Sequence, residues 1–102
     1  MSEKKQSATI TISNPQGLHM RPAYLFAETA ARFQCKIEVV KDDMRIDGKS
    51  VLSILTLGAT QGTEVAVEAT GPDAGDALEQ LVRLVSAGFP DNEAQQPSST
   101  DQ

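Results

Sequence analysis

The sequence contains little of what disulfides, metal sites or cofactor chemistry require. Its 102 residues include one cysteine, Cys35, and one histidine, His19. A single cysteine cannot form a disulfide within the chain, which favours a reducing compartment. A structural zinc site usually needs about four cysteine or histidine ligands. We therefore expect neither a bound metal nor a cofactor, and we interpret Cys35 as a small packing residue.

Basic residues and long apolar runs are also scarce. Nine lysines and arginines stand against fourteen acidic residues, which gives a formal net charge of −5. A nucleic-acid-binding domain would carry a basic face, so this balance argues against that class of partner. No stretch approaches the roughly 18 apolar residues of a membrane-spanning helix, and the polar segment 1–7 leads into no apolar export signal. We expect a cytoplasmic protein that binds neither nucleic acid nor membrane.

Composition divides the chain into a folded part and a polar end. Apolar residues make up 39% of the sequence, which is enough for the core of one domain of this length. We assign this domain to residues 1–89. Residues 90–102 read PDNEAQQPSSTDQ and contain no apolar side chain larger than that of alanine. Such a segment cannot bury enough surface to offset its ordering entropy, so we expect a disordered C-terminal tail.

Four segments alternate between apolar and polar residues, which is the pattern of strands buried on one face. They are Ala8 to Ser13, Ile37 to Val39, Met44 to Ile46 and Val65 to Ala69. The pair Asp42 and Asp43, between the second and third segments, is typical of a turn. Four short alternating strands predict an antiparallel sheet with one covered face.

Two longer segments carry a helical pattern. Met20 to Phe33 and Ala74 to Ala87 place apolar residues three and four positions apart, as on one face of a helix. Asp73 is expected to cap the second helix at its N-terminus. Gly88 suits the left-handed position just past that helix, and Pro90 prevents its continuation, which together predict a Schellman ending.

A third, short helix is predicted from Val51 to Leu57. Ser50 is a favourable N-cap for it, and Gly58 a favourable terminator. The element order is then β-α-β-β-α-β-α. We expect the three helices to cover one face of the four-stranded antiparallel sheet, which makes the fold an α+β open-faced sandwich.

The segment from Asn14 to Ala23 reads NPQGLHMRPA and joins the first strand to the first helix. The pattern places His19 at the N-cap and the next three residues in the first helical turn. A helix N-terminus presents N–H groups and the positive end of the helix dipole. Arg21 adds a fork of donors suited to phosphate oxygens. We therefore expect Arg21 and the backbone amides of Met20 and Arg21 to form an anion site beside the imidazole.

These positive surroundings favour the neutral form of the His19 imidazole, which can act as a nucleophile. Attack on a phosphoryl donor would give phosphohistidine, and the same groups would then hold the phosphoryl group. The plainer interpretation is that His19 is a surface residue or a hydrogen-bonded structural one. Histidine is not a preferred N-cap, and the arginine two positions on points to a role other than helix stability. From the residues alone, both interpretations stay open.

The stretch GLHMRPA resembles the active-site segment of the HPr family, the histidine-containing phosphocarriers of the phosphoenolpyruvate–sugar phosphotransferase system. Two further stretches, from Asp47 to Gly58 and from Gly62 to Leu78, are similar to the family's regulatory serine region and to its last strand and helix entry. The family's fold agrees with the element order predicted above. The resemblance implies that His19 is phosphorylated on Nδ1 and that Arg21 contacts the phosphoryl group. Met20 departs from the small residue that is usual at its position.

The short helix and the serine before it define a second candidate site. From the residues, Ser50 is a plain N-cap, whereas the resemblance implies phosphorylation by a dedicated ATP-dependent kinase. Ile54 and Leu57 can face the sheet, which leaves the other apolar residues of this helix either exposed or in the core. An exposed apolar patch is typical of a partner surface. The resemblance implies a docking patch beside the histidine, to which we assign Lys49, Val51, Leu52 and Leu55.

The leading prediction is a phosphocarrier that accepts a phosphoryl group on His19 from enzyme I and passes it to a IIA component. Such a protein is a relay without enzymatic turnover, and we expect a monomer. HPr kinase/phosphorylase is a further expected partner, at Ser50. Two alternatives stay open. One is a regulatory phosphoprotein controlled at Ser50, and the other is the nitrogen-related paralogue, which uses the same chemistry without sugar transport.

Overall fold

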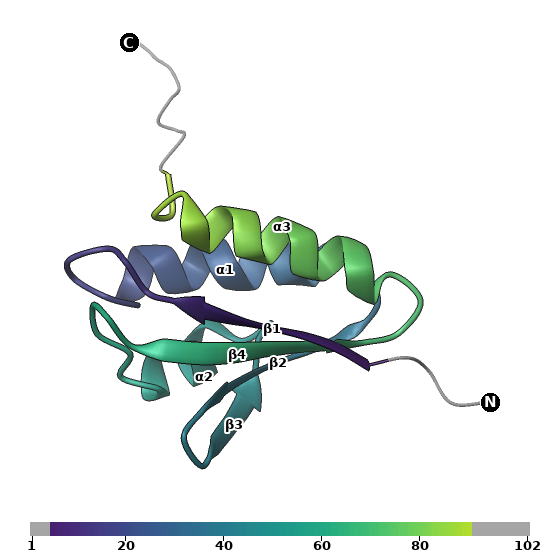
Figure 1. The fold of residues 1–102 in the computed structure, drawn as a ribbon, viewed down its shortest axis with the longest axis horizontal. Helices are drawn as coiled ribbons and strands as arrows, with labels where there is room; N and C mark the ends of the chain where they lie inside the picture. Colours follow the sequence, from purple (N-terminus) through teal and green to yellow (C-terminus); the bar gives the residue numbers. More distant parts are fainter. Residues whose placement is uncertain (1–4, 91–102) are drawn as a thin grey trace, which may run out of the picture.

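The computed structural model describes residues 5–90, which form a four-stranded sheet covered by helices (Figure 1). The elements follow the order β-α-β-β-α-β-α, which confirms the prediction. They are β1 (Lys5–Thr11), α1 (Met20–Ala31), β2 (Lys36–Lys41), β3 (Met44–Asp47), α2 (Val51–Thr56), β4 (Glu64–Thr70) and α3 (Ala74–Ser86). The predicted tail lies outside the described residues from position 91 onward.

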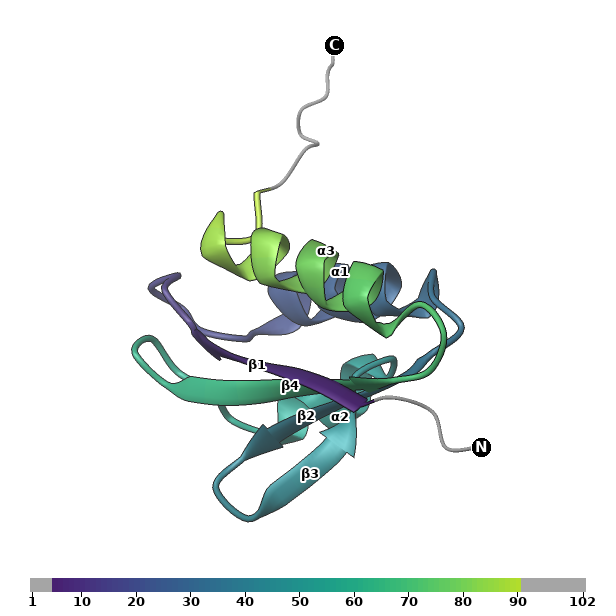
Figure 2. The same ribbon diagram turned by 45° about the vertical axis from the view of Figure 1, so that its right-hand side comes forward.

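The sheet has the strand order β1-β4-β2-β3, and every neighbouring pair is antiparallel. The first and last strands of the domain therefore lie side by side, with Lys5 opposite Thr70 and Thr11 opposite Glu64. Figures 1 and 2 show α1 and α3 packed over the same face of this sheet. The pairing of β1 with β4 brings the loop after β1 close to the loop before β4, which matters for the site described below.

One buried core joins the sheet to all three helices. Its side chains come from the inward face of each of three strands and from the apolar stripes of the helices. The short helix α2 contributes Ile54, and the residue that caps it, Leu57, is buried in the same core. The predicted arrangement of three helices on one face is therefore confirmed. The largest fully buried side chains are Ile12, Ile37, Ile54, Leu57, Leu81, Val39, Val67, Val85 and Cys35.

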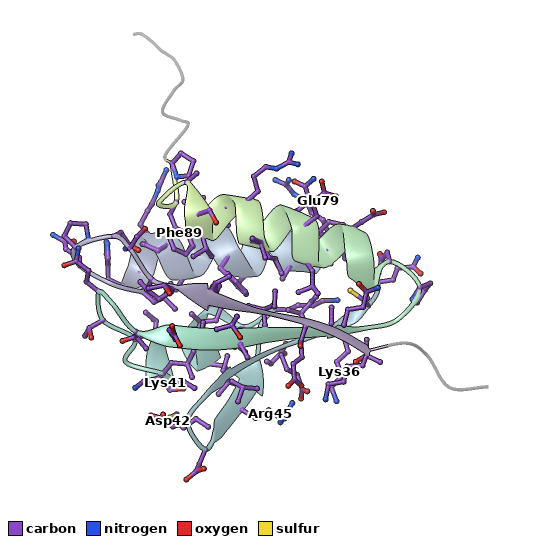
Figure 3. All side chains as sticks on the ribbon, viewed as in Figure 1. Lys36, Lys41, Asp42, Arg45, Glu79 and Phe89 are labelled. Atoms are coloured by element: carbon purple, nitrogen blue, oxygen red, sulfur yellow. The ribbon has the colours of Figure 1, made fainter. Side chains whose placement is uncertain are left out.

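The opposite face of the sheet is polar and crossed by ion pairs. Glu68 accepts from Arg45 and lies 3.0 Å from the Lys5 ammonium, and Arg45 also lies 2.9 Å from Glu38. Figure 3 shows Lys36 and Arg45 on the side of the sheet away from α1 and α3. Arg45 first, and then Lys5, hold the pKa of the Glu68 carboxyl below its usual value. The charged side chains Lys5, Arg45, Glu38 and Glu68 on this face thus pair with one another.

Several element boundaries differ from the predicted ones. β1 begins at Lys5 and ends at Thr11, whereas we predicted Ala8 to Ser13. Its first residues are polar, so alternation could not reveal them, but they complete the ladder with β4. α1 ends at Ala31 rather than Phe33, because the Phe33 amide donates to Ala30 in a tighter three-residue turn. α2 and α3 each end one residue before the predicted limit, and β2, β3 and β4 are longer than predicted.

The two ends of α3 differ in how well their capping was predicted. At the C-terminus, Gly88 adopts φ +78°, its amide donates to Val85, and the Phe89 amide donates to Leu84. These two bonds are the Schellman pattern that we predicted. At the N-terminus, Asp73 occupies the N-cap position, but its side chain makes no capping hydrogen bond. The predicted role of Asp73 as a side-chain cap is therefore wrong, because its carboxylate has other partners.

Candidate functional site

The loop between β1 and α1 is held rigidly against the chain that follows α2. The Leu18 amide donates to the Ala59 carbonyl at 2.9 Å, and both side chains are buried. The Asn14 side chain donates to the Gly17 carbonyl, and the Gly17 amide donates back to the Asn14 carbonyl. Gly17 has φ +69°, and a Cβ there would lie 2.4 Å from the Ala59 oxygen. This loop therefore requires glycine at position 17 and has one well-defined shape.

His19 is the N-cap of α1, as predicted. Its backbone is extended, at φ −84° and ψ −167°, its amide donates to Gly17, and its carbonyl accepts the first helical bond from Ala23 at 3.0 Å. The imidazole makes no capping hydrogen bond and is exposed. The backbone of His19 is thus fixed at both ends, while its ring is open to reagents.

The next two residues share this helix end. Met20 is 60% exposed, and Arg21 is exposed one position further into the first turn. Pro22 is the first buried residue of α1. The structure therefore brings His19, Met20 and Arg21 together at the positive end of α1. An imidazole, a guanidinium and first-turn N–H groups at one helix end suit a nucleophile that must carry a doubly charged phosphoryl group.

α2 presents one exposed apolar residue. Leu52 is 75% exposed, whereas Ile54 and Leu57 are buried at 1% and 2% exposure. The predictions that Ile54 and Leu57 face the core and that Leu52 is exposed are confirmed. Val51 and Leu55 are half-buried rather than exposed, because both pack against the edge of the core. The apolar surface of α2 is therefore narrower than we predicted and centres on Leu52.

Ser50 and Lys49 lie at the far end of α1 from His19. The Lys49 ammonium donates to the Phe33 carbonyl, just beyond the C-terminus of α1, at 2.7 Å. The chain after α2 instead meets Leu18, at the N-terminus of α1, so α2 runs antiparallel to α1. Because α1 is about 18 Å long at 1.5 Å per residue, Ser50 does not lie next to the imidazole. Of the four residues assigned to docking, Lys49 lies at the C-terminal end of α1, and Leu55 lies toward the end of α2 from which the chain continues to Ala59 and Leu18.

The Ser50 hydroxyl has the local role expected of an N-cap. Its oxygen accepts from the Ser53 amide at 3.2 Å, and the residue is partly exposed. This bond satisfies one of the first-turn N–H groups of α2. Ser50 is therefore a structural cap on α2, and the residue is partly exposed to solvent.

Sequence reasoning missed the residues that hold the site in place. Asn14 holds the loop through Gly17, three positions away. Leu18 holds it through Ala59, about 40 positions away, and no local pattern signals a contact over that separation. Cys35 is buried at 1% exposure. Its burial, and then the nearby Asp73 carboxylate, raise the pKa of its thiol to about 11. A neutral, buried thiol fits the packing role that we assigned to Cys35.

Within residues 5–90, no three histidine, cysteine, aspartate or glutamate side chains gather as metal ligands would. None of the helices in that range combines the length and the apolar character that crossing a membrane takes. The described site consists of a nucleophile and positive groups. It belongs to the class of small α+β domains that present one open imidazole at a helix N-terminus.

The family model described as "PTS HPr component phosphorylation site" matches residues 6–87. The chain therefore belongs to the HPr family, whose members are phosphocarrier proteins of the phosphotransferase system.

Individual relatives agree with this assignment. The phosphocarrier protein HPr of Neisseria meningitidis is 37% identical over 89 residues, which cover 87% of this chain and 98% of that protein. A crystal structure of HPr from Thermoanaerobacter tengcongensis superposes with a TM-score of 0.80 at 42% identity, covering 82% of this chain and 94% of the other. A crystal structure of an HPr dimer from the same organism gives a TM-score of 0.69 at 42% identity, covering 82% and 97%.

Proposed function

We propose that this protein carries phosphoryl groups on His19, accepting them from phosphorylated enzyme I and passing them to a IIA component. One observation carries the proposal. The His19 backbone is fixed at the N-cap of α1 by bonds to Gly17 and Ala23, while its ring is open to solvent next to Arg21. A relay group must meet two different partners in turn, so it needs this combination of fixed position and open access.

The transfer needs only the ring and the positive groups around it. The lone pair on Nδ1 of the neutral imidazole attacks phosphorus and forms the N–P bond. The bond from phosphorus to the donor breaks, and its electron pair leaves with the donor. The ring keeps its proton on Nε2 throughout. The same exchange then runs in the other direction, with a IIA nucleophile attacking phosphorus and His19 leaving as the neutral ring.

Arg21 and the first turn of α1 supply the electrostatics. The phosphoryl oxygens carry nearly two negative charges at neutral pH. The helix N-terminus favours negative charge there, and the Arg21 guanidinium offers charge-assisted hydrogen bonds to the same oxygens. The amides of Met20 and Arg21 belong to this first turn. We propose that these groups stabilise phosphohistidine enough for it to persist between the two partners.

Ser50 supports a regulatory function on the same domain. Ser50 is partly exposed and precedes the 75% exposed Leu52 by two residues. Phosphorylation there by an HPr kinase/phosphorylase would add nearly two negative charges at the rim of the α2 surface. A partner that covers both α1 and α2 would then meet an unfavourable charge. We propose that the donor and acceptor complexes cover the α2 surface, including Lys49, Val51, Leu52 and Leu55.

The described site is complete within one chain, so we propose that the working form is a monomer. The decisive test is incubation with phosphoenolpyruvate carrying labelled phosphorus, in the presence and absence of enzyme I. Label that appears only with enzyme I and is lost in acid identifies phosphohistidine, because phosphoserine survives acid. Acid-stable label, or no label, would contradict the relay function. Transfer of the label onward to a IIA protein tests the second half of the proposal.

A further inference from the structure

A groove of about 500 Å³ runs between α1 and α3, on the outer side of the helical layer. The two helices lie side by side in Figures 1 and 2. Arginine is the most frequent residue along the groove, with Arg21, Arg32 and Arg83 against the single acid Glu28. We call this feature the arginine groove. Its other lining residues are Leu25, Thr29, Gln80, Leu84, Ala87 and Pro90.

The arginine groove stands out electrostatically on a chain with a net charge of −5. Arg83 is 2.9 Å from Glu79 on its own helix, an exposed pair of the kind that contributes little stability. Arg83 can therefore exchange that partner for another carboxylate at small cost. The lining has a net positive charge and includes two apolar side chains, Leu25 and Leu84. Such a groove suits an acidic, mostly polar segment.

The sequence that follows Pro90 is acidic and mostly polar. Pro90 lines the groove and is the last described residue. Residues 91–102 read DNEAQQPSSTDQ, and their only charged residues are Asp91, Glu93 and Asp101. An extended chain spans about 3.3 Å per residue, so Asp101 is able to reach any point along the groove. Arg21 and Arg32, near its two ends, lie only about 17 Å apart along α1.

We propose that residues 91–102 bind in the arginine groove and act as an electrostatic brake on His19. Asp91 and Glu93 are one and three residues after Pro90 in the sequence, and the proposal pairs their carboxylates with Arg21 and Arg83. A carboxylate on Arg21 competes with the phosphoryl group that Arg21 would otherwise contact. The binding is argued from the positive lining of the groove and the acidic residues of the tail, whereas the effect on His19 rests on the proposed function. Enzyme I or a IIA protein would have to displace the tail.

The binding is tested without any phosphoryl donor. Backbone amide shifts are compared between the full chain and a variant that ends at Pro90, at low ionic strength. The proposal expects shifts along the groove, including Thr29 and Gln80, which are far from Pro90 in sequence. These shifts should fade as salt is raised to about 0.5 M, because exposed pairs are screened. Shifts confined to residues next to Pro90 would overturn the proposal.

The brake is tested by the rate of His19 phosphorylation from enzyme I. Asp91→Asn with Glu93→Gln should raise the rate at low salt about threefold, the scale of exposed ion pairs, and by less at high salt. The matched control is Asp42→Asn with Asp43→Asn, which removes two charges from the β2–β3 turn; Figure 3 shows Asp42 on the far side of the sheet. Equal acceleration by the control would overturn the brake, since only net charge would then matter.

These two tests separate the tail from the relay. Amide shifts along the groove without any label on His19 would support binding of residues 91–102 and contradict the proposed relay function. Label on His19 without amide shifts along the groove would support the relay function and contradict binding of residues 91–102 in the groove. If Arg83→Gln slows transfer equally with and without residues 91–102, the groove receives the acidic surface of a partner instead, and the proposal is wrong.

Discussion

The carboxylate of Asp73, at the start of α3, accepts hydrogen bonds from two consecutive backbone amides in the turn after α1. Its two oxygens accept from Gln34 and Cys35, each at 2.8 Å. The turn after α1 is thereby tied to the start of α3, across 38 and 39 positions of sequence. These bonds, led by the one from the Gln34 amide, hold the pKa of Asp73 below its usual value of 3.8. They explain why Asp73 does not cap its own helix.

The first prediction concerns the pH dependence of this contact. Because the folded-state pKa of Asp73 is lowered, its contribution to stability is present above the unfolded-state value of 3.8 and is lost as pH falls through the lower folded-state value. Asp73→Ala should therefore destabilise the domain at neutral pH. The difference from the natural chain should shrink in acid. Urea unfolding of both chains between about pH 7 and pH 2 measures this, and a pH-independent difference would contradict it.

The second prediction concerns the loop that positions His19. Gly17→Ala puts a methyl group 2.4 Å from the Ala59 oxygen and 2.8 Å from the Thr60 Cα, both of which are backbone atoms. The loop must move, so we expect a loss of about 3 kcal/mol in unfolding free energy. Phosphorylation of His19 should slow as well, because the N-cap loses its fixed position.

Gly58→Ala is the matched control for this substitution. Its φ of +60° is close to the +69° of Gly17, but a Cβ there meets nothing within 4 Å. It should therefore cost only about 1 kcal/mol, the ordinary price of a left-handed alanine. Denaturant unfolding compares the two variants. Equal losses of unfolding free energy would show that the cost at Gly17 comes from its backbone conformation and not from the close approach of Ala59.

Local patterns were sufficient to predict most of this architecture. Helical spacing around Phe26 and Leu81, alternation around Val67, and the glycine after α3 each depend on neighbours within a few positions. The chemistry of the helix N-terminus is equally local, since His19 and Arg21 are two residues apart. This is why the element order, the N-cap and the Schellman ending could all be derived from the sequence.

Contacts between distant positions could not be predicted. Nothing near Asp73 indicates that its partners are Gln34 and Cys35, and a capping role is the better local interpretation. The direction of α2 relative to α1 also depends on distant contacts, from Lys49 to Phe33 and from Ala59 to Leu18. For that reason, the position of Ser50 at the opposite end of α1 from His19 could not be predicted from local patterns.

The third prediction tests His19 directly. His19→Ala should abolish labelling by enzyme I and leave the fold intact. The imidazole is exposed and makes no capping bond, so its loss should cost at most about 1 kcal/mol of stability. Labelling and thermal unfolding are measured on the same preparation. Retained label on the purified variant would show that another residue is the acceptor.

The last prediction is that Ser50→Asp slows phosphorylation of His19 without distorting the domain. Aspartate is a favourable N-cap and can accept from the Ser53 amide as Ser50 does, so the melting temperature should stay unchanged or rise slightly. Because Ser50 and His19 lie at opposite ends of α1, the new charge acts on a partner that covers both. We expect labelling by enzyme I to slow by about tenfold, equivalent to about 1.4 kcal/mol.

Leu52→Ala distinguishes the loss of an apolar contact from the added charge of Ser50→Asp at the same surface. It removes an exposed apolar side chain and no charge, so it should slow labelling with little dependence on salt. The Ser50→Asp effect should shrink as salt screens the added carboxylate. Labelling rates at low and high salt distinguish the two variants. An early-melting Ser50→Asp protein would point to distortion of α2, and a normal rate at low salt would show that enzyme I does not cover this end of α1.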